Sequence, residues 1–250
     1  MQWSDEGIVL AARRHGETSA VASLLTRGHG RHAGLVRGGA GRTARGMLQP
    51  GNRVEALWRG RLAEHLGSYT LELGKAQGAA LLDDADRLAC LASACGVVEQ
   101  ALPERHPYPA IFDAFCALLD ALSAANTVWP AVYVRWELGL LEQIGFGLDL
   151  AQCAVTGTAE ELIYVSPKSG RAVSAAAGTA YKSRLLALPA FLVGNGAAGA
   201  DDIVAGLTLT GHFLERHLLA HEAAGIAPAR ERFLHRMARK TTRSGGITAV

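Results

Sequence analysis

The sequence predicts an α+β fold in which a small five-stranded β-barrel precedes an all-helical body. The first seventy or so residues consist of short β-branched and apolar runs separated by clusters of Gly, Arg and His. After Gly74 the texture changes, and Leu, Ala and Phe recur at helical spacing. We therefore expect a barrel domain over residues 1–74 and a helical domain over residues 75–250.

Five strands are expected in the first domain, because five apolar runs lie within it, at residues 7–12, 20–26, 32–37, 53–58 and 67–73. Five short strands in so short a segment suit a small closed barrel, and the OB-type barrel is the natural candidate. The segment rich in arginine and glycine would then supply the third strand and the connection to the fourth.

The helical domain is expected to contain helices at residues 76–102, 109–122, 131–144, 201–223 and 227–239. Prolines 103, 107, 109 and 130 mark helix starts and breaks. Residues 147–178 lose the helical spacing and are rich in turn-forming residues, so we expect a small irregular insertion there.

Positive charge is concentrated in the predicted barrel. Residues 27–53 hold six arginines, eight glycines and no acidic residue. A single sign of charge on a backbone that permits close approach indicates a site for polyanions, and arginine favours forked hydrogen bonds to phosphate. A mobile basic loop without a partner is the alternative. The candidate nucleic-acid-binding residues are Arg13, Arg14, Arg31, Arg37, Arg42, Arg45 and Arg53.

The predicted barrel has few aromatic residues with which to hold bases. Before Gly74 the aromatic residues are Trp3, Trp58 and Tyr69, and part of that set is expected in the core. Single-strand binders that stack bases use several such platforms. The composition therefore predicts binding through phosphates, without sequence preference.

Patterns that would indicate catalysis are incomplete. The glycines before Arg42-Thr43 lack the lysine of a phosphate-binding P-loop. His217 and His221 have the i, i+4 spacing of a metal pair, but Leu218 stands where a zinc protease needs glutamate. The carboxylates Asp83, Asp84 and Asp86 could serve a metal-dependent nuclease, although a helix start attracts acids without any catalysis. We expect no enzyme.

Cysteine usage and hydropathy predict a cytoplasmic protein. Three of the four cysteines (Cys90, Cys95, Cys116, Cys153) lie in apolar helical patterns and are expected to be buried thiols in a reducing compartment. No apolar run approaches the ~18–20 residues that span a bilayer. Acidic residues at positions 5 and 6 do not suit a signal peptide.

Short motifs in a fixed order resemble the RecO family of bacterial DNA repair proteins. They cover nearly the whole chain: Gly7-Ile8-Val9-Leu10, Gly16-Glu17-Thr18, Leu24-Leu25-Thr26, Gly30-Arg31, Val36-Arg37-Gly38-Gly39, Leu48-Gln49-Pro50-Gly51, Trp136-Glu137-Leu138-Gly139-Leu140-Leu141 and Ile144-Gly145-Phe146. The resemblance implies an N-terminal OB barrel, a helical body and, in many members, a zinc module with four cysteine ligands. Cys153 matches the first ligand, whereas Thr156, Ser174 and Ala177 replace the others. We expect a metal-free module and no cofactor.

The resemblance implies a non-enzymatic role in recombinational repair, in the RecF pathway. Members bind single- and double-stranded DNA, anneal complementary strands and associate with RecR. They also engage the single-strand-binding protein and so help the RecA recombinase to load onto the coated strand. A nucleoid-associated location is implied. The competing interpretation, an OB-type RNA-binding module, shares the barrel and the arginines but does not explain the helical body.

The resemblance also implies a site for the acidic tail of the single-strand-binding protein, which ends in an apolar residue. Such a tail needs an apolar groove with cations at its rim. The last helical block offers Phe213, Leu214, Leu218 and Leu219 beside the candidate partner-binding residues Arg216, Arg230 and Arg232. In the alternative, the leucines are core and the arginines are merely solvated.

Overall fold

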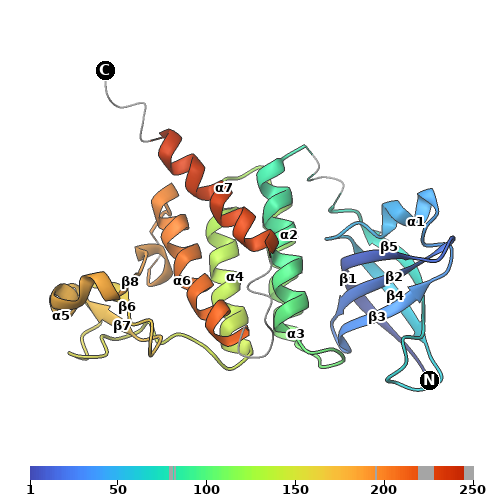
Figure 1. Ribbon diagram of the computed structural model, residues 1–250, viewed down its shortest axis with the longest axis horizontal. Coiled ribbons are helices and arrows are strands. Elements are labelled where there is room, and N and C mark those ends of the chain that lie inside the picture. Colours follow the sequence, from blue (N-terminus) through green and yellow to red (C-terminus); the bar gives the residue numbers. More distant parts are fainter. Residues whose placement is uncertain (79–80, 82, 195, 219–227, 245–250) are drawn as a thin grey trace. The chain divides into compact units, whose positions relative to one another are not determined.

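The computed structural model describes residues 1–78, 81, 83–194, 196–218 and 228–244 (Figure 1). The chain forms two compact units, Met1–Ala125 and Asn126–Val250. The first unit contains the barrel together with two helices. A barrel domain that ends at residue 74 stays a prediction, because the compact unit continues through those helices.

The first unit opens with a closed five-stranded barrel, as predicted. Its strands are β1 (Gln2–His15), β2 (Ser19–Thr26), β3 (Gly30–Val36), β4 (Arg53–Arg59) and β5 (Ser68–Lys75). They follow the order β1-β2-β3-β5-β4, and β1 pairs with both β2 and β4. The β3–β5 pair is parallel and the others are antiparallel. The short helix α1 (Arg42–Met47) connects β3 to β4 and lies against one side of the barrel (Figure 1).

Side chains that alternate in direction along the strands fill the barrel interior. The buried cluster consists of Val9, Ala20, Ala22, Leu24, Val36, Leu48, Val54, Ala56, Trp58 and Tyr69. In β3 every second residue points inward, and in β4 Val54, Ala56 and Trp58 do the same. This period of two is the pattern expected of a half-buried strand. Leu48 carries the cluster into the segment that follows α1.

Two helices complete the first unit: α2 (Ala85–Ala101) and α3 (Pro109–Ser123). The first begins nine residues later than predicted from its apolar spacing. Asp84 caps it, because its carboxylate accepts hydrogen bonds from the backbone N–H groups of Asp86 and Arg87. Before the cap, the chain is held to the barrel by a bond from the Gly78 N–H to the Asn52 side chain.

The second unit contains helices α4 (Trp129–Gln143), α6 (Ala200–Leu218) and α7 (Pro228–Ser244), with contacts between α4 and α6 and between α6 and α7. The predicted irregular insertion is a small sheet of order β7-β6-β8, made of β6 (Leu162–Val165), β7 (Ala172–Ser174) and β8 (Leu186–Ala187). The short helix α5 (Ala175–Gly178) and 3₁₀ turns at Thr179–Arg184 and Ala190–Leu192 adjoin it. The predicted helical residues 219–223 and 227 lie outside the described residues.

None of the helices in the described residues is long and apolar enough to cross a membrane.

Candidate nucleic-acid interface

Arg31 is used to attach the barrel to the α2–α3 connection of the same unit. Its Nε donates to the Leu102 carbonyl at 2.9 Å, and its guanidinium lies 3.2 Å from the Glu104 carboxylate. The backbone N–H of Arg105 donates to the Arg31 carbonyl at 2.8 Å. A phosphate contact would cost the Arg31 side chain its two bonds, so its predicted role in the interface stays a prediction.

Arg53 and Arg27 are likewise engaged with α3. Arg53 donates to the Cys116 carbonyl at 2.7 Å and pairs with Asp120 at 3.0 Å. Desolvation opposes the charge of Asp120, but hydrogen bonds from Lys75 and Arg53 hold its pKa below the ordinary value. Arg27 pairs with Asp113 at 2.9 Å, with both side chains half exposed, so this pair adds little stability. A phosphate contact would likewise cost Arg53 its bonds to α3, so its predicted role in the interface stays a prediction.

Gly30 allows the barrel to approach the α2–α3 connection. Its φ is +69°, and a Cβ at this position would lie 2.0 Å from the His106 carbonyl oxygen. Gly30→Ala should therefore lower the free energy of unfolding by about 2–5 kcal/mol, combining left-handed strain with a backbone clash. Thermal or urea unfolding measures this.

A matched control separates strain from clash in that experiment. Gly16 has a similar φ of +64°, but nothing lies within 4 Å of the Cβ position. Gly16→Ala should cost only about 1–2 kcal/mol. Equal losses in the two variants would contradict the close packing inferred at Gly30.

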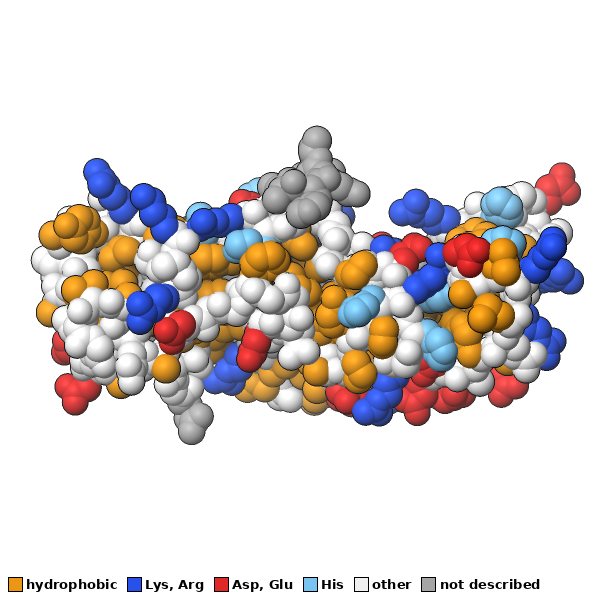
Figure 2. Space-filling model, turned by 90° about the horizontal axis from the view of Figure 1, so that it is seen from below, with side chains coloured by type: hydrophobic (Ala, Val, Ile, Leu, Met, Phe, Trp, Pro, Cys, Tyr) orange, Lys and Arg blue, Asp and Glu red, His pale blue; other side chains and the backbone are white. Residues whose placement is uncertain are grey.

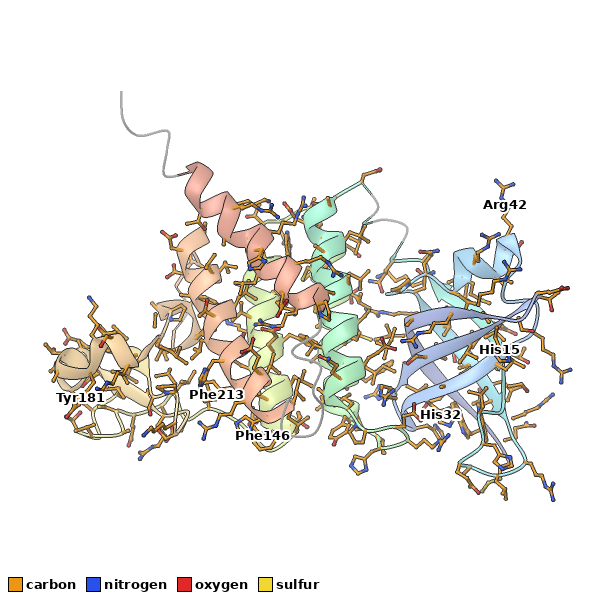
Figure 3. All side chains as sticks on the ribbon, in the orientation of Figure 1. His15, His32, Arg42, Phe146, Tyr181 and Phe213 are labelled. Atoms are coloured by element: carbon orange, nitrogen blue, oxygen red, sulfur yellow. The ribbon has the colours of Figure 1, made fainter. Side chains whose placement is uncertain are left out.

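Four of the candidate arginines are exposed and have side chains that bond to nothing else in the described residues of the unit: Arg13 on β1, Arg37 after β3, and Arg42 and Arg45 on α1. Within the described part of the chain, the guanidinium groups of these four form no hydrogen bond and no ion pair. In Figure 3, Arg42 extends from α1 away from the barrel. Arg14 differs, because it donates to the Gly16 and Glu17 carbonyls and so holds the β1–β2 turn.

The face shown in Figure 2 mixes acidic and basic side chains over the barrel.

The segment of residues 39–52, which carries Arg42 and Arg45, packs closely against the barrel. Gly39 is buried with its Cα close to Ala20, because a Cβ on it would lie 2.8 Å from the Ala20 Cβ. The buried Asn52 donates to the carbonyls of Gly46 and Met47, at 2.9 and 3.0 Å. Residues 39–52 are therefore bonded to and packed on the barrel, and whether their arginines have a partner stays a prediction.

The aromatic residues of the barrel are turned inward or stacked on one another. Trp58 and Tyr69 are buried, and the Trp58 indole donates to the Leu66 carbonyl at 3.0 Å. Trp3 stacks on His29 at 4.0 Å and on Trp58 at 5.7 Å between ring centroids. In residues 1–78, all of which are described, no Trp, Tyr or Phe is exposed as a stacking platform. Base stacking is thus not how this barrel could hold a strand.

The sequence patterns that suggested catalysis have structural explanations. Asp84 is the cap of α2 and pairs with Arg87 at 3.0 Å, and Asp86 lies in the first turn, where the helix dipole favours an acidic residue. His217 stacks on Phe146 at 3.8 Å between centroids, and His221 lies outside the described residues. Over the described ranges, no cluster of three or more His, Cys, Asp or Glu side chains could hold a metal ion.

Cys153 accepts hydrogen bonds from Ser174 and Thr156, two of the three residues that stand where the other zinc ligands would lie. The backbone N–H of Ser174 donates to the Cys153 sulfur at 3.2 Å. Burial raises the pKa of this thiol, but hydrogen bonds from Ser174 and Thr156 outweigh burial and lower the pKa to about 6. The module thus satisfies its one thiolate with hydrogen bonds.

The purified protein should contain no stoichiometric zinc and should keep its melting temperature in strong chelator, since one thiolate cannot hold a structural zinc. Elemental analysis and thermal melting with and without chelator measure this. One tightly bound zinc per chain would contradict the expectation and direct attention to His217 and His221.

The predicted rim cation Arg230 is not at the surface, so that expectation is wrong. Its side chain is 2% exposed and forms a bidentate pair with Glu137, at 2.7 and 2.9 Å. It also donates to the Leu207 carbonyl and to Thr210. The network links α4, α6 and α7, which explains why an arginine occupies the apolar side of α7.

The groove expected beside Arg230 also does not form as predicted. Phe213 and Leu214 are buried core residues, Leu218 is half-buried, and Leu219 lies outside the described residues. Arg216 donates to the carbonyls of Pro167 and Lys168, at 2.6 and 2.9 Å. Arg232 is exposed. Of the three candidate partner-binding residues, only Arg232 remains an exposed cation without such a bond in the described part of the chain.

The closed strand order, with a short helix between the third and fourth strands, defines a protein built on an OB-type barrel followed by a helical body. Two family models match: Recombination protein O N terminal over residues 1–75 and Recombination protein O C terminal over residues 82–223. The chain belongs to the RecO family of DNA repair proteins.

Similar relatives span almost the whole chain. The DNA repair protein RecO of Rhodospirillum centenum is 58% identical over 250 residues, covering 99% of each chain. That of Rhodospirillum rubrum is 52% identical, covering 96% of this chain and 97% of its own. That of Phenylobacterium zucineum is 51% identical, covering 95% and 98%. The resemblance noted from short motifs is thereby confirmed, and with it a role in DNA repair.

Proposed function

We propose that the chain binds single- and double-stranded DNA through phosphate contacts made by Arg13, Arg37, Arg42 and Arg45. The observation that supports this most is the division of the arginines: some are bonded within the unit, whereas these four are exposed without a partner in the described residues. Guanidinium groups form forked hydrogen bonds to phosphate oxygens. Contacts to the backbone carry no sequence information, so binding is general.

We further propose that the chain anneals complementary strands without any catalytic step. Two strands repel each other through their phosphates, and a basic surface that neutralises the backbones lowers this barrier. Because the barrel aromatics are engaged in the core, no stacking platform sequesters the bases that must pair. The arrangement thus supports pairing on the protein surface.

The partners proposed for this activity come from the family. They are RecR, the single-strand-binding protein and, through them, the loading of RecA onto coated strands. The site for the acidic tail is not proposed at the α6–α7 groove, because its expected apolar floor is core and Arg230 is buried. Arg232 stays a candidate contact.

An annealing assay tests the proposal directly. Labelled complementary oligonucleotides should pair faster with the protein than without it, both bare and when coated with the single-strand-binding protein. The labelled strands should keep their length in the presence of magnesium, which excludes the nuclease alternative. An unchanged pairing rate on bare strands would contradict the annealing role, and preferential binding of RNA of the same sequence would favour the RNA-binding alternative.

A further inference from the structure

A cavity of about 570 Å³ opens on the barrel between β1 and the segment around α1. Its floor is apolar and consists of the buried residues Leu10, Ala20 and Leu48. Arg13 and Arg45 stand at its walls, both exposed and without a hydrogen-bond partner in the described part of the chain. The cavity therefore combines an apolar interior with free cations.

Small side chains line much of this cavity. They are two alanines of β1 and the pair Gly39-Ala40, and a Cβ on Gly39 would clash with Ala20. No acidic residue lines the cavity. Such a cavity suits a flat, weakly polar group that is attached to an anion.

We propose that this cavity takes one unpaired nucleobase of a single strand, with the flanking phosphates on Arg13 and Arg45. The inference rests on the proposed DNA binding and adds to it a subsite for a base. An insertion into an apolar cavity replaces the aromatic stacking that the barrel lacks. Most of the lining side chains are apolar, so the base is held mainly by burial of its faces and little by hydrogen bonds to its edges.

An extended strand fits the surroundings of the cavity better than the end of an acidic peptide. Arg37 and Arg42 lie in the same segment of the chain but outside the cavity lining, so further exposed cations are available close in sequence to Arg45. A strand presents phosphates at each nucleotide and can contact these arginines in series, whereas one peptide terminus would use only those at the cavity.

The subsite has a consequence for annealing. A base in a duplex is paired and stacked, so it cannot enter without the cost of being flipped out. The base contact is therefore available to single strands and is lost when they pair. Phosphate contacts remain in both states, and the cavity supplies the preference for the unpaired strand.

A variant with a filled cavity tests this inference. Ala12→Leu and Ala40→Leu together add bulk to the lining at residues that are not part of the buried core and leave every charge in place. Ala63→Leu with Ala110→Leu is a matched control at exposed positions outside the cavity. Thermal melting of both variants establishes that each is folded.

The measurement is the affinity for three labelled ligands of equal length: a thymidine oligonucleotide, the same backbone without bases, and a duplex. The parent and the control should bind the thymidine strand roughly tenfold more tightly than the abasic strand, and the filled variant should bind the two equally. Equal affinity of the parent for the two strands would overturn the base subsite and leave DNA binding intact. Absence of binding to all three would overturn the proposed function itself.

A competition experiment tests whether an acidic peptide, and not a nucleobase, occupies the cavity. A short acidic peptide with an apolar C-terminal residue should not displace the thymidine strand from the parent at concentrations where it is in tenfold excess. Displacement from the parent but not from the filled variant, together with no discrimination against the abasic strand, would assign the cavity to a peptide and overturn the proposal.

Discussion

Replacing Arg37, Arg42 and Arg45 together with alanine should weaken binding to single-stranded DNA about a hundredfold at 0.1 M salt. Each phosphate contact contributes roughly 0.7 to the salt slope of log affinity, so three contacts contribute about two decades between 0.1 M and 1 M. Fluorescence anisotropy with a labelled oligonucleotide measures the loss. The fold should be retained, because α1 buries none of its residues and the three side chains are exposed.

A charge-matched variant is the control for this result. Lys168, Lys182 and Arg184 are three exposed cations of the second unit, and their replacement by alanine removes the same net charge. This variant should bind almost as the parent does. An equal loss in the two variants would show that the affinity follows total charge and not the arginines beside the barrel.

Replacing Glu137 with leucine should lower the free energy of unfolding by about 3–5 kcal/mol, because it leaves a buried guanidinium without its counter-charge. Burial alone would lower the pKa of Arg230, but the Glu137 carboxylate more than offsets burial and keeps the group charged. Glu137 also accepts hydrogen bonds from Tyr133 and Thr210. Urea unfolding measures the change.

Two further variants make this stability prediction specific. Glu142→Leu makes the same chemical change at an exposed position of α4 and should be within about 0.5 kcal/mol of the parent. The double variant Glu137→Leu with Arg230→Met removes both charges and should recover most of the loss. A single Glu137→Leu variant that melts with the parent would contradict the structural role of the pair.

The barrel could be predicted because β3 and β4 alternate between a buried and an exposed face, and β1 and β2 contain short apolar runs. The length of β1 could not, since residues at both its ends are polar and exposed, and their strand conformation comes from pairing with β2 and β4. The predicted start of α2, at residue 76, is also wrong, because composition alone does not fix where a helix begins. Residues 76–84 have a composition that suits a helix, but the cap at Asp84 decides where the helix begins.

The sequence could locate the basic segment, but it could not show which of its arginines are bonded within the protein and which are exposed. Arg31 and Glu104 are 73 positions apart, so nothing local reveals that they meet. The burial of Arg230 could in principle be predicted from the sequence. It shares a helix face with the buried residues Phe233 and Met237, at i+3 and i+7, and an arginine in that register indicates a buried acidic partner. The pattern of apolar residues on α7 carried this signal, whereas its many charges suggested a solvated end.

The salt dependence of single-strand affinity is the most direct test of the claim that the unpaired arginines of the barrel bind phosphates. We expect the slope of log affinity against log salt to flatten by about 2 in the Arg37, Arg42 and Arg45 variant, at roughly 0.7 per lost contact. The slope of the Lys168, Lys182 and Arg184 variant should match that of the parent. A slope in the arginine variant equal to that of the parent would contradict the account, whatever happens to the affinity at a single salt concentration.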